Sequence, residues 1–325
     1  MSIHKQVRTA FVYLFSLTLL YSQIQQETMK PPRGYPNMTF LRWAMALGFL
    51  DLVDLKPEKP DSIRVFKDLV YKETDQRSLR LDIYKRNSIT KLAPAIIFIH
   101  GGGWHKGDKD DYLVYCLSFA EKGYVTASLS YRFSQEAIFP APLEDIICGI
   151  RWIKSHGDEY GIDSSRVALV GGSAGAHLAM MAAYTADELF FESKCNDEGI
   201  STEVQAIVNL YGPTDLTTDF AIAQEPTPRF LGSTYGENPD IYLKASPIHY
   251  ISPDDPPTLT FHGTIDDIVP IYQGDILDKA MKQNGIYHEY HRLKGWPHTM
   301  DAAVPVNKYV QGIMTQFFEK WLRGY

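Results

Sequence analysis

A serine framed by glycines, Ser173, is the most promising nucleophile in the sequence. The apolar run 167–170 precedes it and the small, apolar run 174–185 follows it, which predicts a strand, a sharp turn and a helix. Gly171 and Gly175 stand two residues to either side, where a tight strand-to-helix turn leaves no room for a Cβ atom. Such a turn exposes the serine hydroxyl beside the free N–H groups of a helix N-terminus, which favour an oxyanion.

A second glycine-rich strand end lies upstream. The apolar run 95–99 leads into the sequence HGGGW at residues 100–104. A lone G-x-S-x-G match is a weak signal, because glycine and serine are common and chance matches fall in loops. Two glycine-rich strand ends in this order are hard to explain by chance, so we interpret the pair as parts of one site.

A serine hydroxyl needs a base, and the base needs a group that holds its tautomer. Asp266 follows the short apolar strand expected at 259–261, and in a parallel sheet the loops beyond the strand C-termini are where ligands bind. It is therefore the predicted acid, with the adjacent Asp267 as the alternative. His298 lies in the loop after the last expected strand, 287–293, and is the predicted base.

Other histidines suit this role less well. His288 and His291 fall inside the last expected strand, where the pleat would fix their rings. His100 and His262 stand at strand ends that favour packing or hydrogen bonding, and His177 lies on the helix after the serine, facing away from its turn. The three chosen residues follow one another along the chain in the order Ser173, Asp266, His298, which is the order expected of a nucleophile-elbow serine hydrolase.

Strands and helices alternate along residues 61–325, which predicts one α/β domain with a mostly parallel central sheet, an antiparallel N-terminal edge hairpin and helices on both faces. The expected strands are 65–71, 79–84, 95–99, 124–130, 166–170, 204–210, 259–261 and 287–293, and the expected helices are 112–120, 142–156, 174–185, 271–283 and 304–322. The proline-rich connection 211–257 is long enough to carry short helices and to form part of a substrate-binding cap.

Composition narrows the function classes. The chain has 325 residues, of which 45% are hydrophobic and 22% charged, and its net charge is -7. Without a lysine or arginine cluster it offers nothing for nucleic acid to bind. It has no CxxC or HExxH spacing, and residues 108–111 lack the pattern of a calcium loop and read as a helix start. We expect no metal and no cofactor.

The N-terminus differs in kind from the rest. His4, Lys5 and Arg8 precede the apolar run 10–20, which is too short to span a bilayer and is typical of a signal peptide over residues 1–22. This predicts a secreted or periplasmic protein without a stable membrane span after cleavage; an uncleaved membrane anchor and a buried helix are the alternatives. Residues 23–60 would be a linker with an apolar segment, 40–50, that packs in the core or roofs the site.

The three cysteines are an odd number. Cys116 and Cys148 fall in expected helices among apolar neighbours, and Cys195 follows much later. Buried thiols are therefore expected rather than a disulfide framework.

Four motifs together resemble one superfamily. HGGGW at 100–104, GGSAG at 171–175, YGPTDL at 211–216 and HGTxD at 262–266 are similar to the α/β-hydrolase superfamily of serine esterases. More narrowly, they resemble hormone-sensitive-lipase-like and bacterial feruloyl-esterase-like (BD-FAE-like) carboxylesterases. The resemblance covers the chain from about residue 61 to its end.

The resemblance implies a serine carboxylesterase that hydrolyses small or medium esters through an acyl-enzyme, including acetyl or feruloyl esters of carbohydrate. Ser173, His298 and Asp266 would be its triad, and the backbone N–H groups of Gly102, Gly103 and Ala174 its oxyanion hole.

Trp104, Tyr211 and Trp296 are the candidate substrate contacts, although core packing suits the two tryptophans equally. An amidase, formamidase or peptidase on the same triad, and a non-catalytic binding module of the same fold, are the alternative functions.

Overall fold

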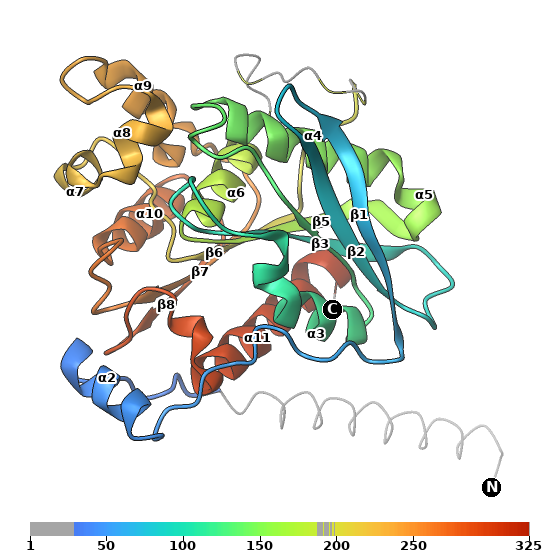
Figure 1. Ribbon diagram of the computed structural model, residues 1–325, viewed down its shortest axis with the longest axis horizontal. Coiled ribbons are helices and arrows are strands. Elements are labelled where there is room, and N and C mark those ends of the chain that lie inside the picture. Colours follow the sequence, from blue (N-terminus) through green and yellow to red (C-terminus); the bar gives the residue numbers. More distant parts are fainter. Residues whose placement is uncertain (1–28, 187–190, 192–194, 196, 198, 325) are drawn as a thin grey trace, which may run out of the picture.

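The computed structural model describes residues 29–186, 191, 195, 197 and 199–324, so the predicted signal peptide, residues 1–22, lies outside the described residues. Eight strands form one sheet in the order β1-β2-β4-β3-β5-β6-β7-β8 (Figure 1). The first two pairings, β1 with β2 and β2 with β4, are antiparallel, and all the others are parallel. The strands are β1 (Ile63–Glu73), β2 (Ser78–Arg86), β3 (Ala93–Ile99), β4 (Val125–Leu129), β5 (Ile162–Gly172), β6 (Ala206–Leu210), β7 (Thr258–Gly263) and β8 (His288–Leu293). The predicted fold class is confirmed.

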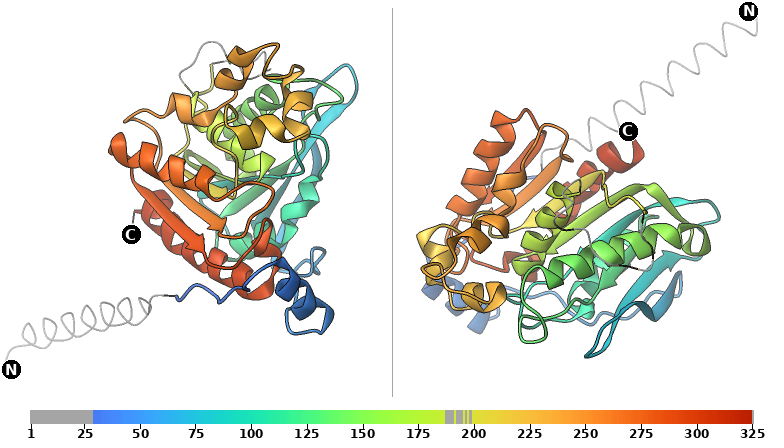
Figure 2. Two further views of the ribbon diagram at one scale, coloured as in Figure 1. Left: turned by 90° about the vertical axis from the view of Figure 1, so that its left-hand side faces the viewer. Right: turned by 90° about the horizontal axis from the view of Figure 1, so that it is seen from above.

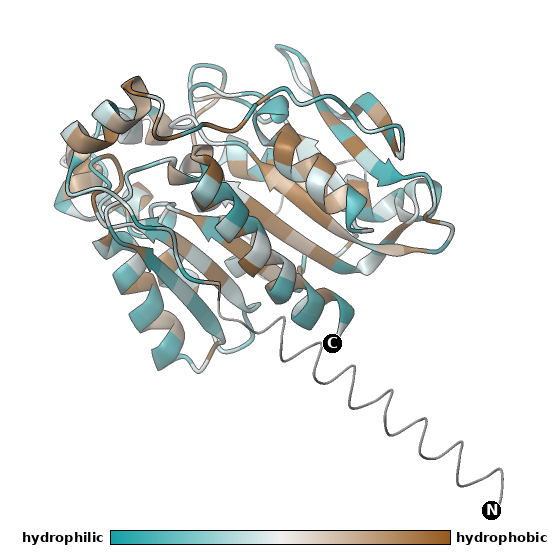
Figure 3. Cartoon of the chain, turned by 90° about the horizontal axis from the view of Figure 1, so that it is seen from below, coloured by the Kyte–Doolittle hydropathy of each residue, from teal (hydrophilic) through white to brown (hydrophobic). Residues whose placement is uncertain are grey.

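Helices cover both faces of the sheet (Figure 2). Alternate residues of β3 show this directly, because Ile97 and Ile99 join one apolar core while Ile96 and Phe98 join the other. The first core packs against α4 (Ala141–Ser155), α6 (Ala174–Tyr184) and α10 (Tyr272–Gln283), and the second against α3 (Leu113–Glu121) and α11 (Val304–Phe318). The central strands are accordingly apolar along much of their length (Figure 3).

Short helices fill several connections, and one extends α11 at its C-terminal end. They are η1 (Lys109–Tyr112), α5 (Gly157–Tyr160), η4 (Met300–Ala302) and η5 (Glu319–Arg323). Asp108 caps η1 through its side chain, so residues 108–111 do form a helix start. Between β6 and β7 the long connection carries α7 (Asp219–Ala223), α8 (Pro226–Leu231), α9 (Pro239–Lys244) and η3 (Pro247–Tyr250). Three of these four begin with proline, which fits the first turn of a helix.

The N-terminal segment forms α2 (Met38–Ala46), whose first N–H groups are capped by the side chain of Asn37. Leu41 and Ala44 are buried, whereas Trp43 and most of the other large apolar residues around it are exposed. Simple core packing, one expectation for residues 40–50, is therefore wrong for most of the segment. Among the described residues, no helix has the length and apolar character needed to cross a bilayer.

A disulfide joins Cys148 on α4 to Cys195, and Cys116 is the buried free thiol. The expectation of buried thiols without a disulfide is thus wrong for two of the three cysteines. The error has a simple cause: 47 positions separate the two partners in sequence, and no local pattern shows that the fold brings their Cα atoms to 5.5 Å.

Candidate active site

The turn between β5 and α6 holds Ser173 in a strained conformation. Its φ of 54° and ψ of -122° place it outside the regions that side-chain-bearing residues prefer. A Cβ atom on Gly171 would lie 2.3 Å from the carbonyl carbon of Gly175, and one on Gly175 would lie 2.1 Å from the carbonyl oxygen of Ile99. Both glycines are therefore required for the close approach that the sequence pattern predicted.

The structure brings Ser173, His298 and Asp266 into one hydrogen-bonded relay. The Ser173 hydroxyl lies 2.9 Å from His298 Nε2, and His298 Nδ1 lies 2.7 Å from Asp266 Oδ2. The backbone N–H groups of Ile268 and Val269 donate to Asp266 Oδ1 and fix the carboxylate. Because Nδ1–H donates to the carboxylate, Nε2 is free to accept the serine proton.

The electrostatics of Asp266 favour its ionised form. Burial raises the pKa of Asp266, but the hydrogen bonds from His262 and His298 outweigh it and bring the pKa to about 2. His262 Nε2 donates to the carbonyl of Val269 and lies 3.4 Å from Asp266 Oδ2, so this strand-end histidine supports the acid from behind. Asp267, the alternative acid, is exposed.

The loop after β3 packs against the serine. Gly102 has φ +106° and Gly103 has φ +59°, and a Cβ atom on Gly102 would meet the carbonyl oxygen of Lys106 at 2.1 Å. Among the hydrogen bonds of the described residues, the backbone N–H groups of Gly102, Gly103 and Ala174 donate to no carbonyl outside their own elements. These three residues line the cavities that Ser173 also lines, where their N–H groups can meet a developing oxyanion.

Two cavities meet at Ser173. The larger, about 490 Å³, is lined by His298, Tyr211, Val114 and Leu55 among others. The smaller, about 60 Å³, is apolar, and its lining includes Trp104, Leu216, Phe220 and Ala221. His298 lines only the larger cavity. In a serine esterase the triad histidine protonates the leaving alcohol, so in such a mechanism the larger cavity would be on the alcohol side of the serine and the smaller one on the acyl side.

The three candidate substrate contacts fall in different places. Trp104 lines the smaller cavity, and its Nε1–H donates to His177 Nδ1 at 3.2 Å. Burial lowers the pKa of His177 to about 4, which keeps this acceptor neutral. Tyr211 lines the larger cavity.

Trp296 lines neither cavity, so of its two expected roles the structure supports core packing and not substrate contact. It is 1% exposed, and its indole N–H donates to the carbonyl of Pro32. Its ring also packs edge-on against Tyr35, so the N-terminal segment covers it and keeps it from the site.

Sequence reasoning missed a buried carboxylate behind the base. Asp301 accepts hydrogen bonds from the hydroxyls of Tyr211, at 2.5 Å, and Tyr115, at 2.9 Å. The Tyr211 ring in turn packs edge-on against His298, with ring centroids 4.6 Å apart. Burial, helped by the charge of Asp301, raises the pKa of Tyr211 well above its usual range and keeps its hydroxyl a donor. No local pattern reveals this cluster, because Tyr115 lies 186 positions from Asp301.

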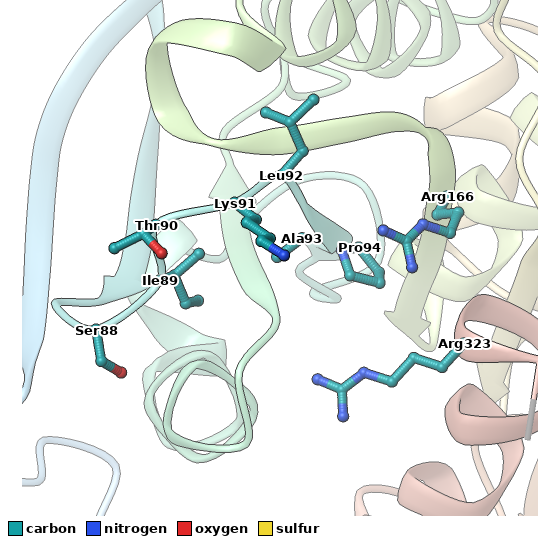
Figure 4. Close-up of a pocket in the computed structure, with 9 residues that line it drawn as sticks. All are labelled: Ser88, Ile89, Thr90, Lys91, Leu92, Ala93, Pro94, Arg166 and Arg323. Carbon is teal, nitrogen blue, oxygen red and sulfur yellow. The ribbon is translucent and has the colours of Figure 1, made fainter.

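A third hollow, about 360 Å³, lies at the start of β3, at the opposite end of the strands from Ser173. Figure 4 shows the side chains that line it. It is lined by residues 88–94 with Arg166 and Arg323, and no histidine or carboxylate is among them. Both arginines are already paired, with Asp163 and Glu319 respectively. The hollow therefore lacks the histidine and carboxylate side chains from which a hydrolytic relay is built. Nor do the described residues include a group of three or more histidine, cysteine or carboxylate side chains placed to hold a metal ion.

The strained serine turn, the relay and the strand order define the class: an α/β-hydrolase fold. Residues 81–281 match the BD-FAE family, and the chain belongs to it.

Relatives and solved structures agree with this membership. The chain is 34% identical to the "Probable carboxylic ester hydrolase LipM" of Mycobacterium tuberculosis, over 66% of this chain and 52% of that protein. It is 31% identical to "Esterase LipQ" of the same organism, over 70% of this chain and 55% of that protein. The chain thus spans about half the length of these curated relatives.

Two solved structures are also similar. A butyrate-bound esterase of Thermogutta terrifontis superposes with a TM-score of 0.70 at 26% identity, over 84% of this chain and all of that one. A bifunctional GH43-CE protein of Bacteroides eggerthii gives 0.72 at 26% identity, over 79% of this chain and 38% of that one.

Proposed function

We propose that this protein is a serine carboxylesterase. The observation that carries the proposal is the Ser173–His298–Asp266 relay, which faces a cavity beside a glycine loop with free N–H groups. The names of the relatives and of the similar structures support the same class of reaction.

In this mechanism the Ser173 oxygen attacks the ester carbonyl carbon while His298 Nε2 takes the hydroxyl proton. The N–H groups of Gly102, Gly103 and Ala174 stabilise the tetrahedral oxyanion, and Asp266 stabilises the imidazolium. The C–O bond to the alcohol then breaks as His298 protonates the leaving oxygen. Water, deprotonated by the same histidine, hydrolyses the acyl-enzyme and restores the serine.

The two cavities favour a short acyl group and a larger alcohol. A water-sized group needs roughly 10–15 Å³ in this measure, so 60 Å³ holds about four to six heavy atoms. Acetyl to butyryl chains fit that space, whereas an aromatic feruloyl group is larger. The alcohol side, at about 490 Å³, has room for a sugar unit. The proposed substrates are therefore short-chain esters of bulky alcohols such as carbohydrates.

The proposed location is secreted or periplasmic. The basic, apolar N-terminus is typical of a signal peptide. The Cys148–Cys195 disulfide adds independent support, because disulfides persist in oxidising compartments and are rare in the cytosol of most organisms.

The first test is hydrolysis of p-nitrophenyl acetate, butyrate and octanoate and of a feruloyl ester by the purified protein, with Ser173→Ala as control. We expect turnover of acetate and butyrate, weak turnover of the longer and aromatic esters, and none by the variant. Activity on the matching anilides but not on the esters would support the amidase alternative. Inactivity on both classes, with a folded protein, would support the non-catalytic alternative.

A further inference from the structure

Two apolar side chains lie at the junction of the two cavities that meet at Ser173. Among the described residues, four line both cavities: Gly103, Ser173, Pro226 and Ile268. The first two belong to the glycine loop and to the nucleophile. The side chains of Pro226 and Ile268 have no group that could take part in acid-base chemistry, and we call this pair the cavity partition. A group bound in either cavity would lie against it.

The fold holds both members of the partition in place. Pro226 begins α8, and a Cβ atom on Gly103 would lie 3.5 Å from the Cβ atom of Pro226, so this proline lies beside the glycine loop. The backbone N–H of Ile268 donates to Asp266 Oδ1 at 3.0 Å, and the N–H of Val269 donates to the same oxygen at 2.8 Å. The backbone at Ile268 is therefore tied to the carboxylate that holds the base.

Ile268 is the member of the partition that a substrate can cover. It is 52% exposed, although it is a large apolar residue. A single exposed apolar residue is ordinary on a protein surface, so the location of this one decides its meaning. Its side chain lines both cavities, and an ester bound at Ser173 would remove it from water, which favours binding. The adjacent Val269 is buried and lines the smaller cavity only.

The two cavities would respond differently to the loss of this side chain. The smaller one, about 60 Å³, holds about four to six heavy atoms, so its size limits the group bound in it. The larger one, about 490 Å³, holds roughly 30 to 50 heavy atoms by the same measure, far more than a small alcohol fills. Truncation of Ile268 would therefore give an acyl chain access to unused space. On the alcohol side it would only remove an apolar contact.

We propose that Ile268 is a specificity-determining residue that keeps the acyl chain in the smaller cavity and out of the larger one. The inference rests on the proposed esterase function and deepens it, because it names a side chain that limits acyl length. In this arrangement the acyl chain and the alcohol contact the same side chain from different cavities. One substitution of Ile268 should therefore change both preferences, and in opposite directions, whereas damage to the relay would lower all rates together.

The test compares the wild type with Ile268→Val and Ile268→Ala. The first readout is the kcat/KM ratio of p-nitrophenyl octanoate to p-nitrophenyl butyrate. It should rise roughly 15-fold in Ile268→Ala, because each newly buried methylene contributes about fourfold and two of the additional methylenes would reach the larger cavity. The second readout is the ratio of 1-naphthyl acetate to p-nitrophenyl acetate. It should fall about fourfold, because the more apolar alcohol loses more contact. Ile268→Val should give intermediate values.

Three control variants separate the partition from its surroundings. Phe220 lines only the smaller cavity, so Phe220→Ala should change the acyl ratio alone. Val114 lines only the larger cavity, so Val114→Ala should change the alcohol ratio alone. Asp267 is exposed and lines neither cavity, so Asp267→Ala should change neither ratio although it alters the residue next to Ile268. Each ratio is measured on one protein sample, which cancels the fraction of folded enzyme.

Failure of this inference can be told apart from failure of the proposed function. An active wild type whose octanoate-to-butyrate ratio is unchanged in Ile268→Ala would overturn the inference and leave the esterase function standing. If the folded wild type hydrolyses no ester, the function falls. Calorimetric titration with butylboronic and octylboronic acid, which bind an activated serine without turnover, then decides the role of Ile268. A higher octyl-to-butyl affinity ratio in Ile268→Ala than in the wild type would support the inference, and equal ratios or no binding would overturn it.

Discussion

The acyl selectivity should depend on two neighbouring residues of α7. Ala221 is 1% exposed and lines the smaller cavity, as does the half-buried Phe220. Ala221→Leu adds three carbons to a space that holds about four to six heavy atoms. Phe220→Ala does the opposite and removes a ring from the wall. The two substitutions should therefore move the preferred chain length in opposite directions.

The magnitude follows from the burial of methylenes. Each buried CH₂ contributes about 0.8 kcal/mol, or roughly fourfold in kcat/KM. In the wild type, butyrate adds two buried methylenes to acetate and should be preferred about 15-fold. In Ala221→Leu that ratio should fall to about one or below, because the added side chain occupies the room for those methylenes. In Phe220→Ala the hexanoate-to-butyrate ratio should rise by roughly tenfold.

The assay compares p-nitrophenyl esters of increasing chain length on the same protein sample, so the fraction of folded enzyme cancels in each ratio. Overpacking at Ala221 should cost about 1–3 kcal/mol of stability, which thermal unfolding will show separately. Val114→Ala is the matched control, since Val114 lines only the larger cavity. A butyrate-to-acetate ratio in Ala221→Leu equal to that of the wild type would refute the assignment of the smaller cavity to the acyl group.

Three further predictions concern the base, the acid and the disulfide. Tyr211→Phe should lower kcat roughly tenfold with KM unchanged, because it removes the hydrogen bond that fixes the ring beside His298; an unchanged kcat would contradict this positioning role. The low pKa of Asp266 stabilises the folded state above about pH 4, and this stabilisation is lost as the pH falls from about 4 to 2. The unfolding free energies of the wild type and of Asp266→Asn, measured in urea, should therefore differ at neutral pH and approach each other only in that range; a difference that does not depend on pH would contradict this. Replacing Cys148 and Cys195 with serine should cost about 2–4 kcal/mol in unfolding free energy, since the bond closes a loop of 47 positions; no change would mean that the bond does not form.

The sequence was sufficient for the parts of the site that lie in local patterns. The turn at Ser173 is visible because a strand, two glycines and a helix occur in immediate succession. Asp266 and His298 could be chosen because each follows a strand, and the C-terminal ends of parallel strands meet at one edge of a sheet. Sheet topology alone then brings together groups that are far apart in sequence.

Features that depend on packing between distant segments were not accessible in this way. Trp296 has the sequence position of a substrate contact, but Pro32, 264 positions earlier, meets its indole N–H. The Cys148–Cys195 disulfide and the Tyr115–Asp301 contact share this cause. The exposure of the apolar side chains in residues 40–50 could not be predicted for a different reason: an apolar sequence pattern does not show whether another element of the fold covers those side chains.

Because His298 lines only one of the two cavities, its position suggests that alcohol specificity and acyl specificity are determined by different parts of the chain. In the proposed mechanism His298 protonates the leaving group, which assigns the alcohol to the larger cavity, and the N-terminal segment borders this cavity through Val53 and Leu55. The acyl group is left to the smaller cavity, whose wall comes largely from the β6–β7 connection. Changes in the N-terminal segment should therefore alter alcohol preference, and changes in α7 and α8 should alter acyl preference. Substitutions in either region should leave the Ser173–His298–Asp266 relay in place, because the relay residues follow strands of the parallel sheet and belong to neither region.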